Sequence, residues 1–145
     1  MTTDWEGFVQ ALAQCLSELP SRATLIIAAP GNRYVQFVQY DIKLSAELAG
    51  NQFLAQPISL DAAETLRDMG WQEPIVRREI DNWHRILFWP LSWNGLVEFA
   101  RSVAFGLHEA LGVGTPEELR AMGWTEASGD LDLTVLGPMV RRNSN

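Results

Sequence analysis

A hexapeptide occurs twice in this chain with one difference, and each copy predicts the end of a helix. The copies are Leu66–Trp71, which reads Leu-Arg-Asp-Met-Gly-Trp, and Leu119–Trp124, in which alanine replaces the aspartate. Glycine most easily adopts the left-handed backbone found just beyond a helix, and the tryptophan after it is placed to pack on the leucine five residues earlier. Because the flanking sequences are not similar, we interpret the repeat as recurrent capping and not as a duplicated domain.

Two longer segments have the periodicity of amphipathic helices. The first follows the capping-box spacing of Thr3–Glu6 and ends at Pro20, and the second runs from Asn94 until Gly112 stops it. In both segments apolar residues recur at three- and four-residue steps. These positions are Trp5, Phe8, Leu12, Cys15 and Leu19 in the first segment and Leu96, Ala100, Val103, Leu107 and Leu111 in the second.

Each hexapeptide also follows a helix start. Ser59 is a good cap for a short helix whose apolar positions are Leu60, Ala63 and Leu66. Thr115–Glu118 combines a threonine cap, proline in the first turn and glutamate three residues after the cap. Both hexapeptides are therefore predicted to close short helices.

Strands are predicted in the first half of the chain. Residues 24–29 have apolar side chains at both odd and even positions, and a Pro-Gly-Asn turn follows them. Residues 33–40 are rich in strand-forming side chains. Residues 43–48 alternate between apolar and polar, which completes a three-stranded antiparallel meander. Residues 83–89 predict a further strand limited by Pro90, with a short helix as the alternative.

These elements predict an α+β fold of two layers, with the antiparallel β-meander packed against N-terminal and C-terminal helices. No linker or change of composition divides the chain. We expect one domain over residues 1–129. Residues 130–145 are predicted to form a C-terminal tail that is extended or partly disordered.

Composition narrows the classes of partner. The formal net charge is −7, which repels phosphate backbones and anionic lipid surfaces, so we expect neither nucleic acid nor membrane as a partner. No apolar run reaches the roughly 20 residues that a membrane helix needs. The start of the chain does not resemble a secretory signal, and Cys15 is the only cysteine, so a cytoplasmic location is expected.

Reactive side chains are scarce. His84, His108 and Cys15 are the only histidines and cysteine, and their spacing matches no transition-metal site. No nucleophile motif or phosphate-binding glycine fingerprint is present, and nothing in the spacing of the carboxylates singles out an acid/base pair. We therefore expect a binding protein that is not an enzyme and that has no cofactor or metal.

Aromatic side chains outside the predicted core are the candidates for a partner or dimer interface. On a helical wheel Phe105 falls opposite Leu96, on the otherwise polar side of its helix, where a second subunit would cover it. The segment 88–93 holds Phe88 and two tryptophans, and alternation turns Phe88 and Trp89 to opposite faces. Residues 34–40 have apolar side chains on both parities. The candidates are Phe105, Trp89, Trp93, Tyr34 and Tyr40.

The order of several motifs resembles the Tir-chaperone/YbjN-like proteins, also called TY-Chap domains, and the resemblance covers about residues 5–124. It rests on the N-terminal helix with tryptophan and phenylalanine, on the Leu-x-x-Met-Gly-Trp stop with Pro74 shortly after it, and on three further segments. These segments are Gly31–Phe37, Leu44–Asn51 and Leu111–Leu119.

This resemblance implies a small, acidic, cytosolic homodimer that holds an extended segment of a client polypeptide on its sheet and helix surfaces. It implies no catalytic residues. Two other hypotheses remain open from the sequence. One is an acidic immunity or inhibitor protein that neutralises a basic partner. The other is a small-molecule-binding domain that uses the tryptophan-rich region as an aromatic pocket.

Overall fold

A computed structural model describes residues 4–75, 78–127, 129–139 and 141–142. The strands are β1 (Thr24–Ala29), β2 (Arg33–Gln39), β3 (Lys43–Leu48), β4 (Trp83–Phe88), β5 (Arg120–Thr125), β6 (Gly129–Asp130) and β7 (Arg141–Arg142). The helices are α1 (Trp5–Ser17), α2 (Leu60–Asp68) and α3 (Trp93–Phe105), which continues as the π-helical turn η3 (Gly106–Ala110). The short 3₁₀ segments are η1 (Asn51–Phe53), η4 (Pro116–Glu118) and η5 (Thr134–Met139).

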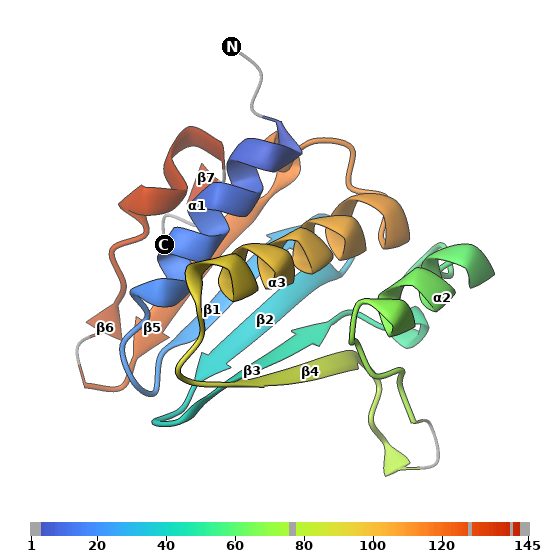
Figure 1. Cartoon of the computed structure of the whole chain (residues 1–145). Coiled ribbons are helices and arrows are strands. Elements are labelled where there is room, and N and C mark those ends of the chain that lie inside the picture. Colours follow the sequence, from blue (N-terminus) through green and yellow to red (C-terminus); the bar gives the residue numbers. More distant parts are fainter. Residues whose placement is uncertain (1–3, 76–77, 128, 140, 143–145) are drawn as a thin grey trace.

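The chain forms two layers, which confirms the predicted α+β class. Neighbouring strands follow the order β4–β3–β2–β1–β5–β6 and are antiparallel, while β7 lies parallel to β5. Helices α1 and α3 lie side by side over one face of the sheet, and α2 packs beside η3 (Figure 1). Within the described ranges, no helix is both long and apolar enough to cross a membrane.

The meander forms as predicted. Alternate residues of β1, β2 and β3 point toward the helices and are buried, because an extended chain turns successive side chains to opposite faces. The register pairs Ile27 with Val35 and Phe37 with Ala46. The buried side chains of these strands are Leu25, Ile27, Ala29, Val35, Phe37, Gln39, Leu44, Ala46 and Leu48.

Helix α1 begins one residue later than the capping-box spacing predicts. Asp4 is its cap, and its carboxylate accepts a hydrogen bond from the backbone N–H of Gly7 at 2.8 Å. Asp is as good a cap as Thr, so the prediction misplaced the cap by one position. Thr3 lies outside the described residues. The helix ends at Ser17, before Pro20, as expected.

The long helix begins at Trp93, where the hydroxyl of Ser92 accepts from Gly95 N. Its last turn lies close to β3, because a Cβ on Gly106 would approach Leu48 Cδ2 to 2.7 Å. A larger residue would have to displace the Leu48 side chain, which favours glycine where the helix meets the sheet. Gly112 follows the helix with φ +77°, as predicted.

The first hexapeptide ends a helix in the predicted way. Gly70 has φ +98°, and its N–H donates to Arg67 O at 3.0 Å. The N–H of Trp71 donates to Leu66 O at 3.0 Å, which completes a Schellman motif. Trp71 packs into the core with 2% of its surface exposed.

The second hexapeptide does not end a helix, so that prediction is wrong. Leu119 is buried, and the five residues after it belong to β5, which pairs with β1 from Ala28–Arg120 to Thr24–Trp124. The helix start before it yields only the 3₁₀ turn η4. The hydrogen-bonding edge of β1 supplies ladder partners for this segment, and that long-range pairing overrides the local helix signal.

Residues 130–145 were predicted to form a tail that is extended or partly disordered, whereas their described part contains a packed 3₁₀ segment. Segment η5 packs against α1, and Leu133 and Leu136 belong to the hydrophobic core. Leu131 and Val135 are partly buried against the same core. Burial of four apolar side chains in six residues stabilises this segment, and the prediction overlooked that spacing.

Candidate functional site

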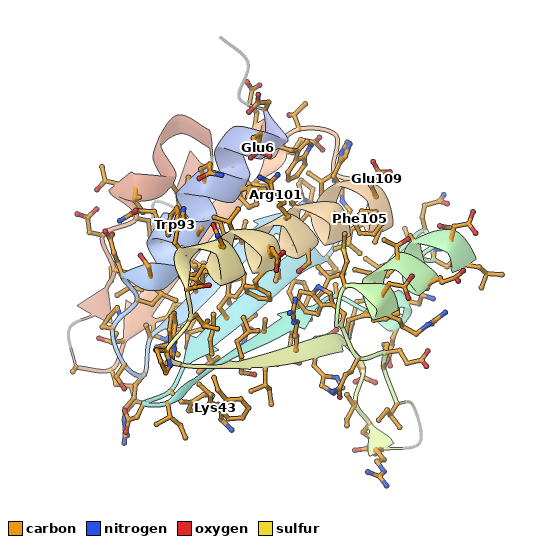
Figure 2. The ribbon with its side chains drawn as sticks, in the orientation of Figure 1. Glu6, Lys43, Trp93, Arg101, Phe105 and Glu109 are labelled. Atoms are coloured by element: carbon orange, nitrogen blue, oxygen red, sulfur yellow. The ribbon has the colours of Figure 1, made fainter. Side chains whose placement is uncertain are left out.

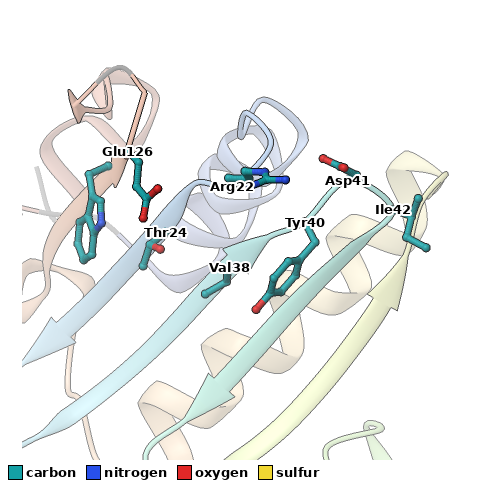
Figure 3. Close-up of a pocket in the computed structure, with 8 residues that line it drawn as sticks. Arg22, Thr24, Val38, Tyr40, Asp41, Ile42 and Glu126 are labelled. Atoms are coloured by element: carbon teal, nitrogen blue, oxygen red, sulfur yellow. The ribbon is translucent and has the colours of Figure 1, made fainter.

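One face of the sheet is free of helices in the described part of the chain, and we call it the open face (Figures 1 and 3). Alternation places on it the side chains of Thr24, Ile26, Ala28, Tyr34, Gln36, Val38, Lys43, Ser45, Glu47, His84, Ile86, Phe88, Arg120, Met122 and Trp124. Large exposed hydrophobic side chains gather here. Among the described residues five of seven belong to this face or to its rim, namely Tyr40, Ile42, Ile86, Phe88 and Trp124.

A hollow of about 560 Å³ lies at one end of the open face, where β1, β2 and β5 meet the β2–β3 turn. Its lining residues are Arg22, Thr24, Val38, Tyr40, Asp41, Ile42, Trp124 and Glu126. Figure 3 shows Thr24, Val38 and Tyr40 projecting from neighbouring strands onto this face. The hollow therefore combines an apolar floor with a rim that carries both signs of charge.

Tyr40 is the predicted candidate that lies in this hollow. Its backbone N–H donates to Lys43 O at 2.8 Å, which closes the β2–β3 turn. The ammonium nitrogen of Lys43 lies 5.2 Å from the centre of the Tyr40 ring, within range of a cation–π contact. The ring therefore has a defined position at the rim and remains exposed.

Of the other four candidates, Tyr34 also lies on the open face. Its hydroxyl accepts a hydrogen bond from Asn82 Nδ2 at 2.8 Å, and its ring is partly buried. Trp89 is also partly buried, and its Nε1 donates to Gln39 Oε1 at 2.9 Å. Trp93 is exposed at the start of α3, on the helical side of the molecule (Figure 2). The structure thus brings Tyr34 and Tyr40 onto one face and places the others elsewhere.

Phe105 does not stand on a wholly polar helix face, which corrects the helical-wheel expectation. Its ring is partly buried and packs against the core. Ser102, which the wheel placed on the same polar side, is buried, and its hydroxyl accepts a hydrogen bond from Trp71 Nε1 at 3.1 Å. Neighbouring elements therefore bury part of the α3 side that was predicted to be polar, in addition to its apolar face.

Two functional candidates escaped the sequence analysis. Trp124 was assigned to a helix end, although Met122 and Trp124 alternate with Ala121 and Gly123 as they would on a strand. That alternation was the available signal. Ile42, with 66% of its surface exposed, lies in the turn between two strands and carries no periodic signal.

Two of the scarce reactive side chains, Cys15 and His108, are held by contacts within the fold. Burial raises the pKa of the Cys15 thiol to about 11, with a smaller contribution from the charge of Glu18, which keeps the thiol protonated at neutral pH. His108 Nδ1 donates to Val113 O at 2.7 Å, and its ring lies 5.1 Å from that of Trp5. The described residues contain no group of three or more His, Cys, Asp and Glu side chains that could hold a metal ion.

In the part of the chain that the structure describes, the outer edge of β4 has unpaired backbone groups. His84 exchanges hydrogen bonds with Gln72 on that edge, at 2.9 and 3.0 Å. Trp89 N donates to Ile42 O on the opposite, paired side. Antiparallel ladders alternate the direction of their backbone groups, so those of Ile86 and Phe88 point outward beyond the Gln72 bridge. At the other edge, β6 and β7 pair with β5.

Comparison with curated proteins and with solved structures gives no match. The chain does match the family TY-Chap3, described as "T3SS (YopN, CesT) and YbjN peptide-binding chaperone 3", over residues 1–125. The match includes all of the meander, the three α-helices and β5. It agrees with the α+β fold and with the resemblance noted in the sequence. The chain belongs to the TY-Chap3 family of peptide-binding chaperones.

Proposed function

We propose that this chain is a non-enzymatic, chaperone-like protein that holds an extended segment of a client polypeptide on its open face. The observation that carries the proposal is the concentration of exposed hydrophobic side chains on the one sheet face that no described helix covers. Exposed apolar surface is unfavourable by about 25 cal/mol per Å², and contiguous patches of it mark interaction sites. A bound client segment would remove this surface from water.

The size of the open face suits an extended peptide. Five strands, β4, β3, β2, β1 and β5, span about 20 Å at the usual strand spacing, which is the length of roughly six extended residues. The hollow formed with Val38, Tyr40 and Trp124 would take one apolar anchor of the client. After a turn at the β4 edge, the backbone of Ile86 and Phe88, which is unpaired among the described residues, would allow the following client residues to pair along β4.

The proposal includes a homodimer. With the sheet face left to the client, the second subunit is expected to contact the helical side, where Trp93 is exposed and Phe105 lies on α3 (Figure 2). Light scattering should give twice the mass of one chain. Phe105→Glu, with folding checked by thermal unfolding, should give the mass of one chain, and a folded variant that stays dimeric would place the interface elsewhere.

Peptide selection tests the client surface. The protein would be immobilised and used to select binders from a random peptide library, and affinities would then be measured by fluorescence anisotropy. Val38→Asp puts a charge in the floor of the hollow and should weaken binding by about tenfold or more, because burying that charge costs well over 1.4 kcal/mol. Leu60→Asp, at the exposed start of α2 on the helical side, is the matched control and should bind like the wild type.

Two results would contradict this placement of the site. Peptides that bind Val38→Asp as tightly as wild type do not use the open face. A loss in Leu60→Asp that equals the loss in Val38→Asp would indicate a client on the helical side. Thermal unfolding of both variants separates loss of binding from loss of structure.

A further inference from the structure

Arg85 is held in a fixed position on the helix-facing side of the edge strand β4. It pairs in register with Ala46, whose side chain points into the core. The guanidinium carbon lies 5.2 Å from the centre of the Phe99 ring, within cation–π range. On its other side, a Cβ on Gly70 would lie 3.1 Å from Nε and 3.2 Å from Cζ. The guanidinium therefore lies between an aromatic ring of α3 and the backbone that ends α2.

This guanidinium has no hydrogen-bond acceptor or ion-pair partner among the described residues. Arg33, Arg67 and Arg101, by contrast, do have such partners. Arg33 donates to the carbonyl oxygens of Pro30 and Gly112 at 2.8 and 3.0 Å, and Arg101 forms an ion pair with Glu6. Arg85 is partly buried, which lowers its pKa, and the charge of Glu98 only partly opposes that effect. A partly buried cation without a hydrogen-bond acceptor or an ion pair is an unusual arrangement.

We propose that Arg85 is the binding site for a carboxylate of the client peptide, an inference that rests on the proposed function. A planar guanidinium presents parallel N–H donors that match the two oxygens of a carboxylate. Because Phe99 and Gly70 already restrict the group, little side-chain entropy is lost when it binds. We expect a singly charged carboxylate and not a phosphate dianion. Glu98 and the net charge of −7 repel a ligand with two negative charges more strongly than a ligand with one.

The location of Arg85 connects it to the open face. Ile86, the next residue of β4, points to the open face, whereas Arg85 points to the helical side of the same edge strand. A client segment that lies on the open face and turns around the free edge of β4 brings its following residues to Arg85. The carboxylate is then either the carboxyl terminus of the client or an Asp or Glu side chain shortly after the turn.

A titration with sodium acetate tests the site without any client. The Nε–H resonances of the arginines would be followed by NMR in the full-length protein, with sodium chloride at equal ionic strength as the reference. We expect a saturable shift at Arg85 that is absent from the exposed Arg22 and Arg120. A shift that rises linearly with salt and is equal for all three arginines would overturn the proposal.

Three variants sharpen this titration. Arg85→Met keeps an apolar stem on Phe99 and should abolish the saturable effect of acetate on neighbouring signals. Glu98→Gln removes a carboxylate that acts electrostatically on Arg85 and should tighten acetate binding about two- to fivefold, as expected for a screened charge pair. Arg101→Met removes an exposed, already paired cation and should leave acetate binding unchanged. Equal acetate binding by Arg85→Met and wild type would overturn the proposal, provided thermal unfolding shows both to be folded.

Peptide arms distinguish the two sources of the carboxylate. A selected peptide would be compared with a free carboxyl terminus, with an amidated terminus, and with its acidic side chains replaced by amides. Loss of affinity in one arm that disappears in Arg85→Met identifies the group that Arg85 binds, whereas unchanged affinity in every arm overturns the client role. Acetate binding at Arg85 with no selected peptides at all would refute the proposed function and leave the carboxylate site intact.

Discussion

Leu66–Trp71 and Leu119–Trp124 share five of six residues and adopt different structures. The first ends helix α2 in a Schellman motif, whereas all but the first residue of the second belong to strand β5. Their tryptophans are 2% and 38% exposed, so one lies in the core and the other on the open face. A strong local signal therefore decides the structure only where no competing long-range partner is present, and β1 is such a partner for the second copy.

The single residue that differs between the two hexapeptides fits their different environments. Asp68 is exposed in the last turn of α2. Its counterpart Ala121 is 2% exposed and belongs to the core between the sheet and the helices. An aspartate would be tolerated at the first position and would be a buried, unpaired charge at the second.

Ala121→Asp should have the largest effect. Burying an uncompensated carboxylate costs about 3–5 kcal/mol, a large part of the free energy of unfolding of a domain this size. Urea unfolding followed by circular dichroism measures the loss. The control is Arg120→Asp, one residue earlier and exposed on the opposite face, which should change stability by less than about 0.5 kcal/mol. Similar losses in the two variants would mean that β5 does not face the core as described.

Replacement of each tryptophan by alanine should give the next largest contrast. Trp71→Ala removes a core side chain that stacks on Phe99 and should cost about 3–5 kcal/mol in urea unfolding. Trp124→Ala removes a partly exposed ring and should cost about 1 kcal/mol or less, while weakening binding of the selected peptides. A large stability loss at Trp124 without a binding defect would count against the open face as the client site.

Gly70 and Gly123, the glycines of the two hexapeptides, should tolerate alanine and asparagine in opposite orders. At Gly70, with φ +98°, alanine should cost about 1–2 kcal/mol and asparagine less, because asparagine tolerates the left-handed region. Gly123 does not have a positive φ, and a Cβ there would lie 3.1 Å from Thr24 O and 2.9 Å from Leu131 Cδ1. Asparagine, being larger, should therefore be worse than alanine at Gly123. Thermal unfolding of the four variants gives both orders, and the same order at both sites would contradict the assigned conformations.

Asp68→Ala makes the two hexapeptides identical and should have a small effect. The change removes an acid from the carboxyl-terminal turn of a helix, where the helix dipole disfavours it, and introduces the best helix former. Stability should rise by about 0.3–0.5 kcal/mol in urea unfolding. The near-ultraviolet circular dichroism of the tryptophans should not change. A changed spectrum would show that the aspartate itself helps to choose the helical conformation.

The smallest effect is expected from a change at Glu118, in the helix-start sequence that precedes the second hexapeptide. The backbone N–H of Thr115, joined by that of Gly114 and by Arg33, lowers the pKa of Glu118 below its ordinary value, although partial burial opposes the shift. Its contribution to stability is therefore complete above about pH 4.5 and is lost as the pH falls through the lowered pKa. Glu118→Gln should lower the melting temperature slightly at neutral pH, and the difference should vanish in strong acid. A difference that grows on acidification would contradict the sign of the shift.

Local periodicity was enough to predict the meander, the two long helices and the first helix end, because each depends on neighbours in sequence. It failed where distant residues decide the outcome. Strand β5 depends on β1, which begins 96 residues earlier, and the burial of Leu133 depends on α1. Tyr40 could be named as a candidate because strand parity places it opposite the core side chains. Trp124 was missed because its conformation had been assigned from the hexapeptide alone.

Cys15 lies in α1 beside the segment that holds Leu131, Leu133 and Val135. Its thiol is buried, and its pKa of about 11 leaves almost no thiolate at neutral pH, so reagents reach it only when this part of the molecule opens. Cys15 is therefore a built-in probe of local opening. The rate at which Cys15 is alkylated reports how often residues 129–139 separate from α1, without any engineered probe.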